Sequence, residues 1–157
     1  MRMIFSFCFY YDKMYSGDIM SKITRSELRK KVMTILYQVN VYNNNKIEYK
    51  LDDVINEVLD IDNDFVKDCV YGVLTNINII DEKANKYLNK WTIDRLGFTD
   101  QAILRLGIYE LLYTDTPDVV AINEAIDLAK LYSDDDVKKM INGVLDKVYH
   151  EKVDNEQ

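Results

Sequence analysis

The sequence predicts an all-α protein in which two small helical bundles pack tightly against each other. Apolar residues recur mostly at three- and four-residue spacing, the period of an amphipathic helix, and seldom in the alternation of a half-buried strand. Five glycines and one proline among 157 residues leave little material for β-hairpin turns. Because no linker is visible between the halves, we place one helical domain at 20–150, with subbundles at approximately 20–80 and 81–150.

The first helix is predicted to begin after a capping box made by Thr24 and Glu27. Arg29, Lys30 and Tyr37 fall on faces away from the apolar stripe, and Lys22, Arg25 and Lys31 add to the positive charge. Cations bind phosphates and aromatic rings stack on unpaired bases, so this pattern suits single-stranded RNA. The alternative interpretation is an ordinary solvated helix surface.

The middle of the chain shows helical periodicity over 51–59, over 65–80 with Asp62 or Asp64 as cap, and from Asp81 to Trp91. Gly72 and Gly143 lie inside helical patterns, where glycine is unfavourable, so we expect close helix crossings at both. We expect Trp91 in the core, since an indole buries a large area.

Three further helices are predicted between Asp100 and Lys147. Thr99 is the expected cap of the first, Thr116 and Pro117 begin the second, and the acidic run 134–136 begins the third, where a helix N-terminus favours negative charge. We expect 151–157 to be a flexible tail.

Three strings in this segment, AILRLGIYELL, VVAINEAIDLAK and KMINGVLDKV, resemble the C-terminal half of the transcription antitermination factor NusB family, in the same order. The resemblance extends back through Trp91 and Gly72 to Thr24 and covers roughly 20–148. It implies two three-helix bundles with about seven helices in all.

The resemblance also implies functional residues. RNA would contact the basic first helix, the end of the middle bundle and the start of the last helix, at Lys22, Arg25, Arg29, Lys30, Tyr37, Tyr87, Asp136 and Met140. A protein partner, NusE, would contact Asp100, Arg105, Tyr109 and Glu110. Those four residues alternate with Ile and Leu, so interior salt bridges are an equal alternative.

The chain departs from the family pattern at two points near the last helix. The family usually has phenylalanine where Met140 stands, and the segment before this helix is more acidic here. Both differences would weaken or reshape RNA binding. The net charge of −7 likewise argues against a protein that coats nucleic acid alone, because non-specific affinity comes from cations that neutralise phosphates.

The function implied is that of a cytoplasmic, RNA-binding factor that joins NusE on the boxA element of nascent ribosomal RNA, within the RNA polymerase antitermination complex. The alternative is a helical protein–protein adaptor with a decayed RNA face. We expect no enzyme, cofactor, metal site or membrane span: the single histidine, His150, is near the end of the chain, no glycine-rich phosphate loop occurs, and Cys8 and Cys69 lack metal-ligand spacing.

The first nineteen residues form an N-terminal extension that lies outside the resemblance. The segment is rich in Phe and Tyr, and Met20 follows it directly. We interpret it as the product of a misplaced start codon. The alternative is an additional segment that covers an apolar groove.

Overall fold

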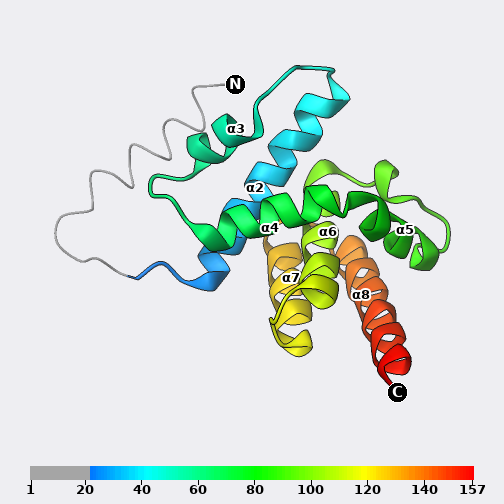
Figure 1. The fold of residues 1–157 in the computed structure, drawn as a ribbon. Coiled ribbons are helices and arrows are strands. Elements are labelled where there is room, and N and C mark those ends of the chain that lie inside the picture. The colour runs from blue at the N-terminus through cyan, green and yellow to red at the C-terminus, as the bar shows by residue number, and fades with distance from the viewer. Residues whose placement is uncertain (1–21) are drawn as a thin grey trace.

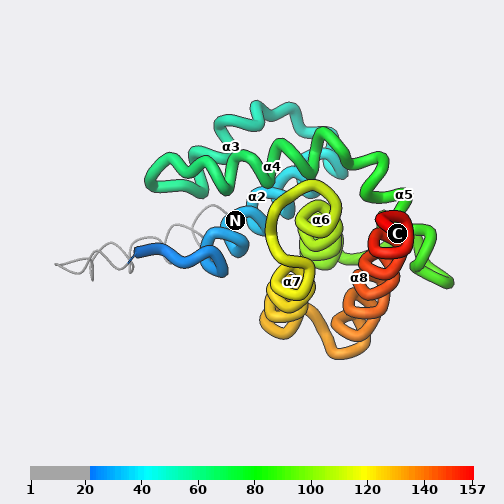
Figure 2. Tube along the Cα trace, turned by 60° about the horizontal axis from the view of Figure 1, so that its bottom comes forward, coloured from blue at the N-terminus to red at the C-terminus, as the bar shows by residue number. Residues whose placement is uncertain are grey.

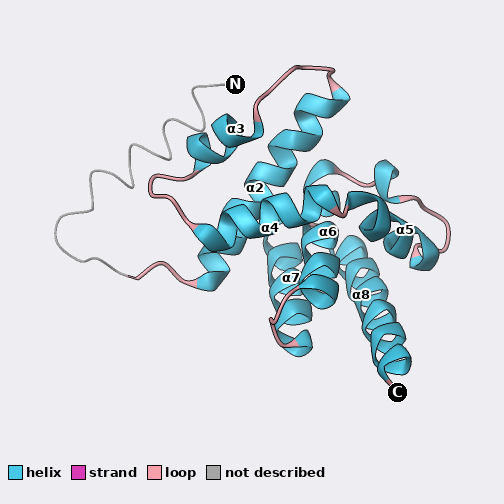
Figure 3. Ribbon diagram, viewed as in Figure 1, coloured by secondary structure: helices cyan, strands magenta, loops and turns pink. Residues whose placement is uncertain are grey.

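The computed structural model describes residues 22–157, so the interpretation of residues 1–19 lies outside the described part. Within that part Figure 3 shows helices and loops alone, and the all-α prediction is confirmed. Seven α-helices and one short 3₁₀ helix follow in order along these residues: α2 (Arg25–Asn44), α3 (Leu51–Val58), α4 (Asp64–Thr75), α5 (Ile77–Tyr87), η1 (Ile93–Arg95), α6 (Phe98–Tyr113), α7 (Asp118–Tyr132) and α8 (Asp135–Glu156).

Helix α6 forms the centre of the molecule. It lies against α2, α4, α5, α7 and α8, and every residue from 101 to 111 is buried. The run AILRLGIYELL makes this helix apolar on nearly all sides. Such a helix is stable only when other elements bury it on all sides. Figure 2 shows α6 nearly end-on, with α2, α3 and α4 on one side and α7 and α8 on the other.

The two bundles share one core. Helices α3 and α4 pack on α2, while α7 and α8 pack with α6 and with each other (Figure 1). The buried apolar side chains form a single cluster that runs through both groups. Helix α5 packs on α6 and α8 and crosses the expected boundary at 80/81, because it starts at Ile77.

Several predicted helix starts are confirmed and others are shifted. Thr24 and Glu27 form the capping box, and the acidic run does cap α8, where Asp134 accepts the Val137 amide at 2.9 Å. The cap of α4 is Asn63 and neither of the expected aspartates. Helix α6 begins after Gly97 and α7 after Pro117, two residues and one residue away from the predicted caps Thr99 and Thr116.

Expectations about three single positions and about the C-terminal tail can now be compared with the structure. Gly72 does lie at a close crossing, because a Cβ there would overlap the ring of Tyr109. Gly143 does not, since nothing lies within 4 Å of a Cβ built on it. The expectation that Trp91 lies in the core is wrong: α5 ends before this residue, and its side chain is 55% exposed. The tail at 151–157, which was expected to be flexible, is helical as far as Glu156.

Candidate nucleic-acid interface

The loop between α5 and α6 presents polar and aromatic side chains because its apolar residues are anchored inward. Leu88 and Ile93 are buried. The Ile93 amide donates to Asn85 Oδ1 at 2.8 Å, and Gln101 Nε2 donates to the Leu96 carbonyl at 2.9 Å. These bonds fix the loop to α5 and α6, and the residues between the anchors face outward.

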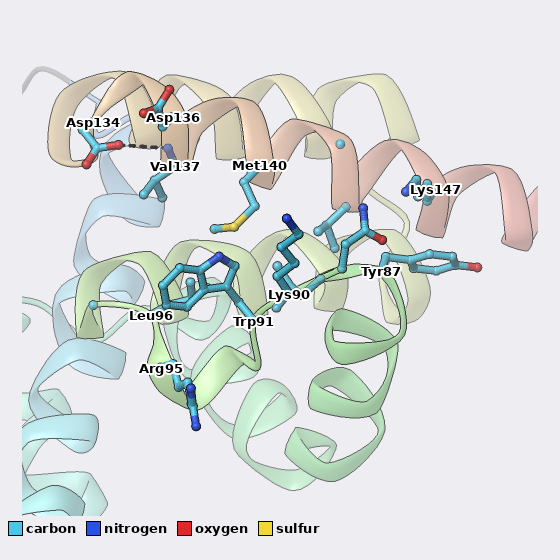
Figure 4. A pocket seen from close by; sticks show the side chains of 15 residues that line it. Tyr87, Lys90, Trp91, Arg95, Leu96, Asp134, Asp136, Val137, Met140 and Lys147 are labelled. Carbon is cyan, nitrogen blue, oxygen red and sulfur yellow. Dashed lines mark hydrogen bonds between the residues drawn. The ribbon is translucent and has the colours of Figure 1, made fainter.

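An open cavity of about 670 Å³ lies between this loop, the end of α5 and the first half of α8 (Figure 4). Positions 136, 140, 143, 144 and 147 of α8 line it, which places them on one face at helical spacing. The volume falls in the range of ligand-binding pockets, about 300–1,000 Å³. Its lining brings together three residues that the sequence predicted for RNA binding, Tyr87, Asp136 and Met140.

The cavity combines exposed aromatic surface with mixed charge. Trp91 and the half-buried Tyr87 and Met140 supply apolar surface. The cations among its lining residues are Lys90, Arg95 and Lys147, and the carboxylates are Asp134 and Asp136. In Figure 4 Lys90 points toward α8, whereas Arg95 points away from it.

Tyr87 is held by a carboxylate from the far end of α8. Its hydroxyl donates to Glu151 Oε2 at 2.8 Å, and Lys83 and Lys86 donate to Glu151 Oε1 at 2.8 and 3.0 Å. These three bonds, those from the lysines first, lower the pKa of Glu151 to about 2. The ammonium of Lys147 lies 6.0 Å from the centre of the Tyr87 ring. The ring is therefore fixed beside cations at one end of the cavity.

None of the α2 residues that the sequence predicted for RNA contact lines the cavity. Tyr37 packs edge-on against Phe98, with ring centres 6.4 Å apart, and Gly97, the residue before Phe98, lines the cavity. Lys30 is exposed and lies seven residues before Tyr37, a spacing that places both on the same side of α2. Arg25 is exposed elsewhere, with its guanidinium 4.3 Å from the centre of the Phe65 ring on α4. Lys22 is exposed ahead of the helix.

Arg29, which was predicted from the sequence to contact RNA, is buried in an ion pair in this structure. Its side chain is 4% exposed, and it donates to the carboxylate of Glu110 from Nη2 at 2.7 Å and from Nε at 2.9 Å. Thr116 adds a third donor to the same carboxylate. The pair satisfies both buried charges and joins α2 to α6, and it leaves the guanidinium covered from solvent.

The partner residues expected on α6 are also interior. Glu110 pairs with Arg29, and Arg105 donates to both Asp81 oxygens at 2.8 and 2.9 Å. Tyr109 is buried over Gly72, and its hydroxyl donates to the Asp68 carbonyl. The interior salt bridges that the sequence left open are therefore the ones present. The fourth residue, Asp100, is half-buried and accepts from the Ser133 hydroxyl, which ties the start of α6 to the turn before α8.

Lys90, Trp91, Arg95 and Lys147 also line the cavity, and none of them was predicted from the sequence to bind RNA. For Lys147 a signal existed, since it follows Asp136 and Met140 at i+11 and i+7 along one helix face. Trp91 was expected to be buried because an indole has a large apolar area. The sequence does not show that α5 ends four residues before it, at Tyr87.

Three further features of residues 22–157 bear on function. No group of three or more His, Cys, Asp or Glu side chains in this part could hold a metal ion. None of its helices combines the length and apolarity needed to cross a bilayer. Burial raises the pKa of the Cys69 thiol to about 12, with the Glu110 carboxylate adding to the effect, as in an inert structural cysteine.

The fold and the cavity define a class: small all-helical proteins built from two bundles around a central helix, with an open site of aromatic surface and mixed charge beside the last helix. Comparison with known proteins agrees. The NusB family model matches residues 26–150. The transcription antitermination protein NusB of Campylobacter jejuni (strain 81-176) is 44% identical over 125 residues, which cover 78% of this chain and 93% of that protein.

Solved structures show the same fold. The chain superposes on NusB from T. maritima with a TM-score of 0.73 and 34% identity, covering 83% of this chain and 93% of that one. A crystal structure of antitermination factors NusB and NusE in complex with dsRNA matches with a TM-score of 0.68 and 27% identity, covering 81% and 96%. The chain belongs to the NusB family.

Proposed function

We propose that this chain is a non-enzymatic, RNA-binding transcription antitermination factor that binds boxA of nascent ribosomal RNA together with NusE. In this role it promotes processive transcription and ribosomal RNA maturation. The observation that carries the proposal is the cavity, which gathers Tyr87, Trp91 and Met140 beside Lys90 and Lys147. Aromatic platforms beside cations are how proteins hold unpaired nucleotides.

Two observations support NusE as a protein partner: the net charge of this chain and the structure of a relative. A net charge of −7 opposes RNA binding by this chain alone, and one NusB of the same fold was crystallised with NusE and dsRNA. A partner that supplies further RNA contacts would overcome the repulsion. Specificity then arises from the coupling free energy between the two proteins on one RNA, which is reciprocal.

Because Arg105, Tyr109 and Glu110 are occupied inside the molecule, we propose that α6 supports NusE binding indirectly. Its buried ion pairs fix α2 and α5 relative to each other: Arg105 Nη1 also donates to Asn40 on α2 at 2.9 Å. NusE would contact outward-facing residues on the helices that α6 positions.

A second candidate, a protein–protein adaptor with a decayed RNA face, is favoured by particular residues. Met140 stands at the cavity in place of an aromatic ring, and Asp134 and Asp136 place negative charge on its wall. The burial of Arg29 removes one of the expected cations.

The proposal is tested by fluorescence anisotropy with labelled boxA RNA, titrated with this chain alone and with NusE, over a series of salt concentrations. We expect NusE to tighten binding, and the affinity to fall by about 0.7 log units per log unit of salt for each phosphate contact. A scrambled RNA of the same length is the control. Binding of NusE without any binding of boxA RNA would favour the adaptor.

A further inference from the structure

The exposure of Trp91 is a built feature of the loop, not a consequence of a loose segment. The loop is pinned on both sides by buried Leu88 and Ile93 and by the Asn85 and Gln101 hydrogen bonds. Even so, the indole remains 55% exposed and lines the cavity. A side chain with so much apolar area would lower the free energy of the fold by turning inward. Its position therefore suits a ligand that covers it.

The wall opposite the indole is formed by α8. In Figure 4 the sulfur-bearing end of Met140 points toward the ring of Trp91 across the cavity. Met140 is half-buried and packs against the core, and its unbranched thioether chain can adapt to a ligand. A flat aromatic platform thus faces a polarisable, flexible side chain.

We propose that Trp91 is a base-stacking residue of the cavity, and that one unpaired RNA base lies between its indole and the thioether of Met140. This rests on the proposed function and adds the ligand class of the site, a single unstacked nucleobase. It also accounts for Met140, because the aromatic surface is supplied from the loop on the other side of the base.

The surrounding charges fit a nucleotide in this position. Lys90, adjacent to Trp91, points toward α8, and Lys147 lies on α8 at the Tyr87 end of the cavity. Their ammonium groups can neutralise the phosphates that flank a stacked base. Asp136 lies on the same α8 face as Met140, and its carboxylate accepts hydrogen bonds, which suits the amino groups of base edges and disfavours a phosphate there.

The test uses the intrinsic fluorescence of Trp91, the only tryptophan of the chain. Single-stranded boxA RNA is titrated into the intact protein while its binding is followed in parallel by anisotropy of a labelled copy. We expect tryptophan quenching that tracks the anisotropy. Trp91→Ala should weaken RNA binding by about 10- to 100-fold, as for loss of one base stack, and Trp91→Phe by less.

A set of RNAs, each with one abasic position, separates stacking from a structural role. At one position, removal of the base should weaken binding to the wild type but have little further effect on Trp91→Ala. Tyr113→Ala is the matched control, because this exposed aromatic residue ends α6 at the other end of the helix from Gly97. Thermal unfolding verifies that each variant is folded.

The outcomes are distinguishable. If the wild type binds no RNA by anisotropy, with or without NusE, the proposed function fails and the inference fails with it. If the wild type binds RNA without quenching, and folded Trp91→Ala binds every abasic RNA as the wild type does, the stacking inference alone is overturned.

Discussion

Arg25 and Arg29 lie one helical turn apart on α2, and only their surroundings distinguish their roles. Arg29 is closed inside an ion pair with Glu110, whereas Arg25 is exposed over the Phe65 ring. The sequence could not separate them, because Glu110 is 81 positions away from Arg29. Helical periodicity shows which residues share a face, but it does not show that a distant carboxylate will cover one cation of a basic cluster.

Arg29→Ala is expected to lower the free energy of unfolding by about 3–5 kcal/mol, because it leaves the buried Glu110 carboxylate without its partner. Arg25→Ala is the matched control and should change stability by less than about 1 kcal/mol, since an exposed cation–π contact is weak. Urea unfolding followed by circular dichroism measures both. Equal, small effects would contradict the buried ion pair.

Glu151→Gln tests the bond that holds Tyr87. The folded pKa of Glu151, about 2, lies below its ordinary value of 4.5, so the ionised carboxylate stabilises the fold above about pH 4.5. That contribution is lost as the pH falls toward 2. The stability difference between wild type and Glu151→Gln should therefore be constant near neutrality and shrink between these values. The check is chemical unfolding over pH 2–7; a difference independent of pH would refute the assignment.

At the scale of the helices, periodicity predicted most of the structure and failed at their ends. The apolar stripe continues from Val73 to Ile80, so the sequence indicated one helix where α4 and α5 are two. The break falls at Asn76, whose side chain donates to the Gly72 carbonyl at 2.8 Å. A polar side chain that bonds back to its own helix competes with further backbone bonds, and the spacing of apolar residues does not report it.

The two helical glycines provide a paired prediction. Gly72→Ala should destabilise the protein by about 1–3 kcal/mol, because the added methyl group overlaps the Tyr109 ring between α4 and α6. Gly143→Ala should instead stabilise it by about 0.5–1 kcal/mol, since its Cβ meets open space inside α8. Differential scanning calorimetry compares the two.

Gly143→Ala is the control for Gly72→Ala, because it adds the same methyl group to a helix where nothing is in contact with it. A double variant tests whether the Tyr109 ring causes the Gly72 effect. Combining Gly72→Ala with Tyr109→Leu removes the aromatic ring from the crossing, so the double variant should lose less stability than the two single losses added together. Strict additivity would show that the Gly72 effect does not arise from this contact.

At the scale of the whole molecule, the candidate site depends on how distant segments pack together, which no local sequence pattern shows. The cavity requires the loop after α5 to meet the first half of α8, and the Ser133 to Asp100 bond holds the start of that helix beside α6. Tyr87, Asp136 and Met140 were selected through the family resemblance, and the fold brings them together. Trp91 was predicted to be buried, because the preference of an indole for the core takes no account of where a helix stops.

The overall charge restricts how such a site can work. With a net charge of −7, RNA can be attracted only where cations gather locally, and within the described residues Lys90 and Lys147 at the cavity and Lys30 on α2 are exposed. The central claim is therefore spatial: RNA meets the molecule at the cavity and along the adjoining side of α2.

The most direct test is an NMR titration of the isotopically labelled chain, bound to unlabelled NusE, with boxA RNA. The account predicts that the largest shift changes fall on the Trp91 indole, on the amides of 87–97, on the first half of α8 and on the exposed side of α2. Changes confined to α3 or α7, with the Trp91 indole and the amides of the cavity unmoved, would contradict it.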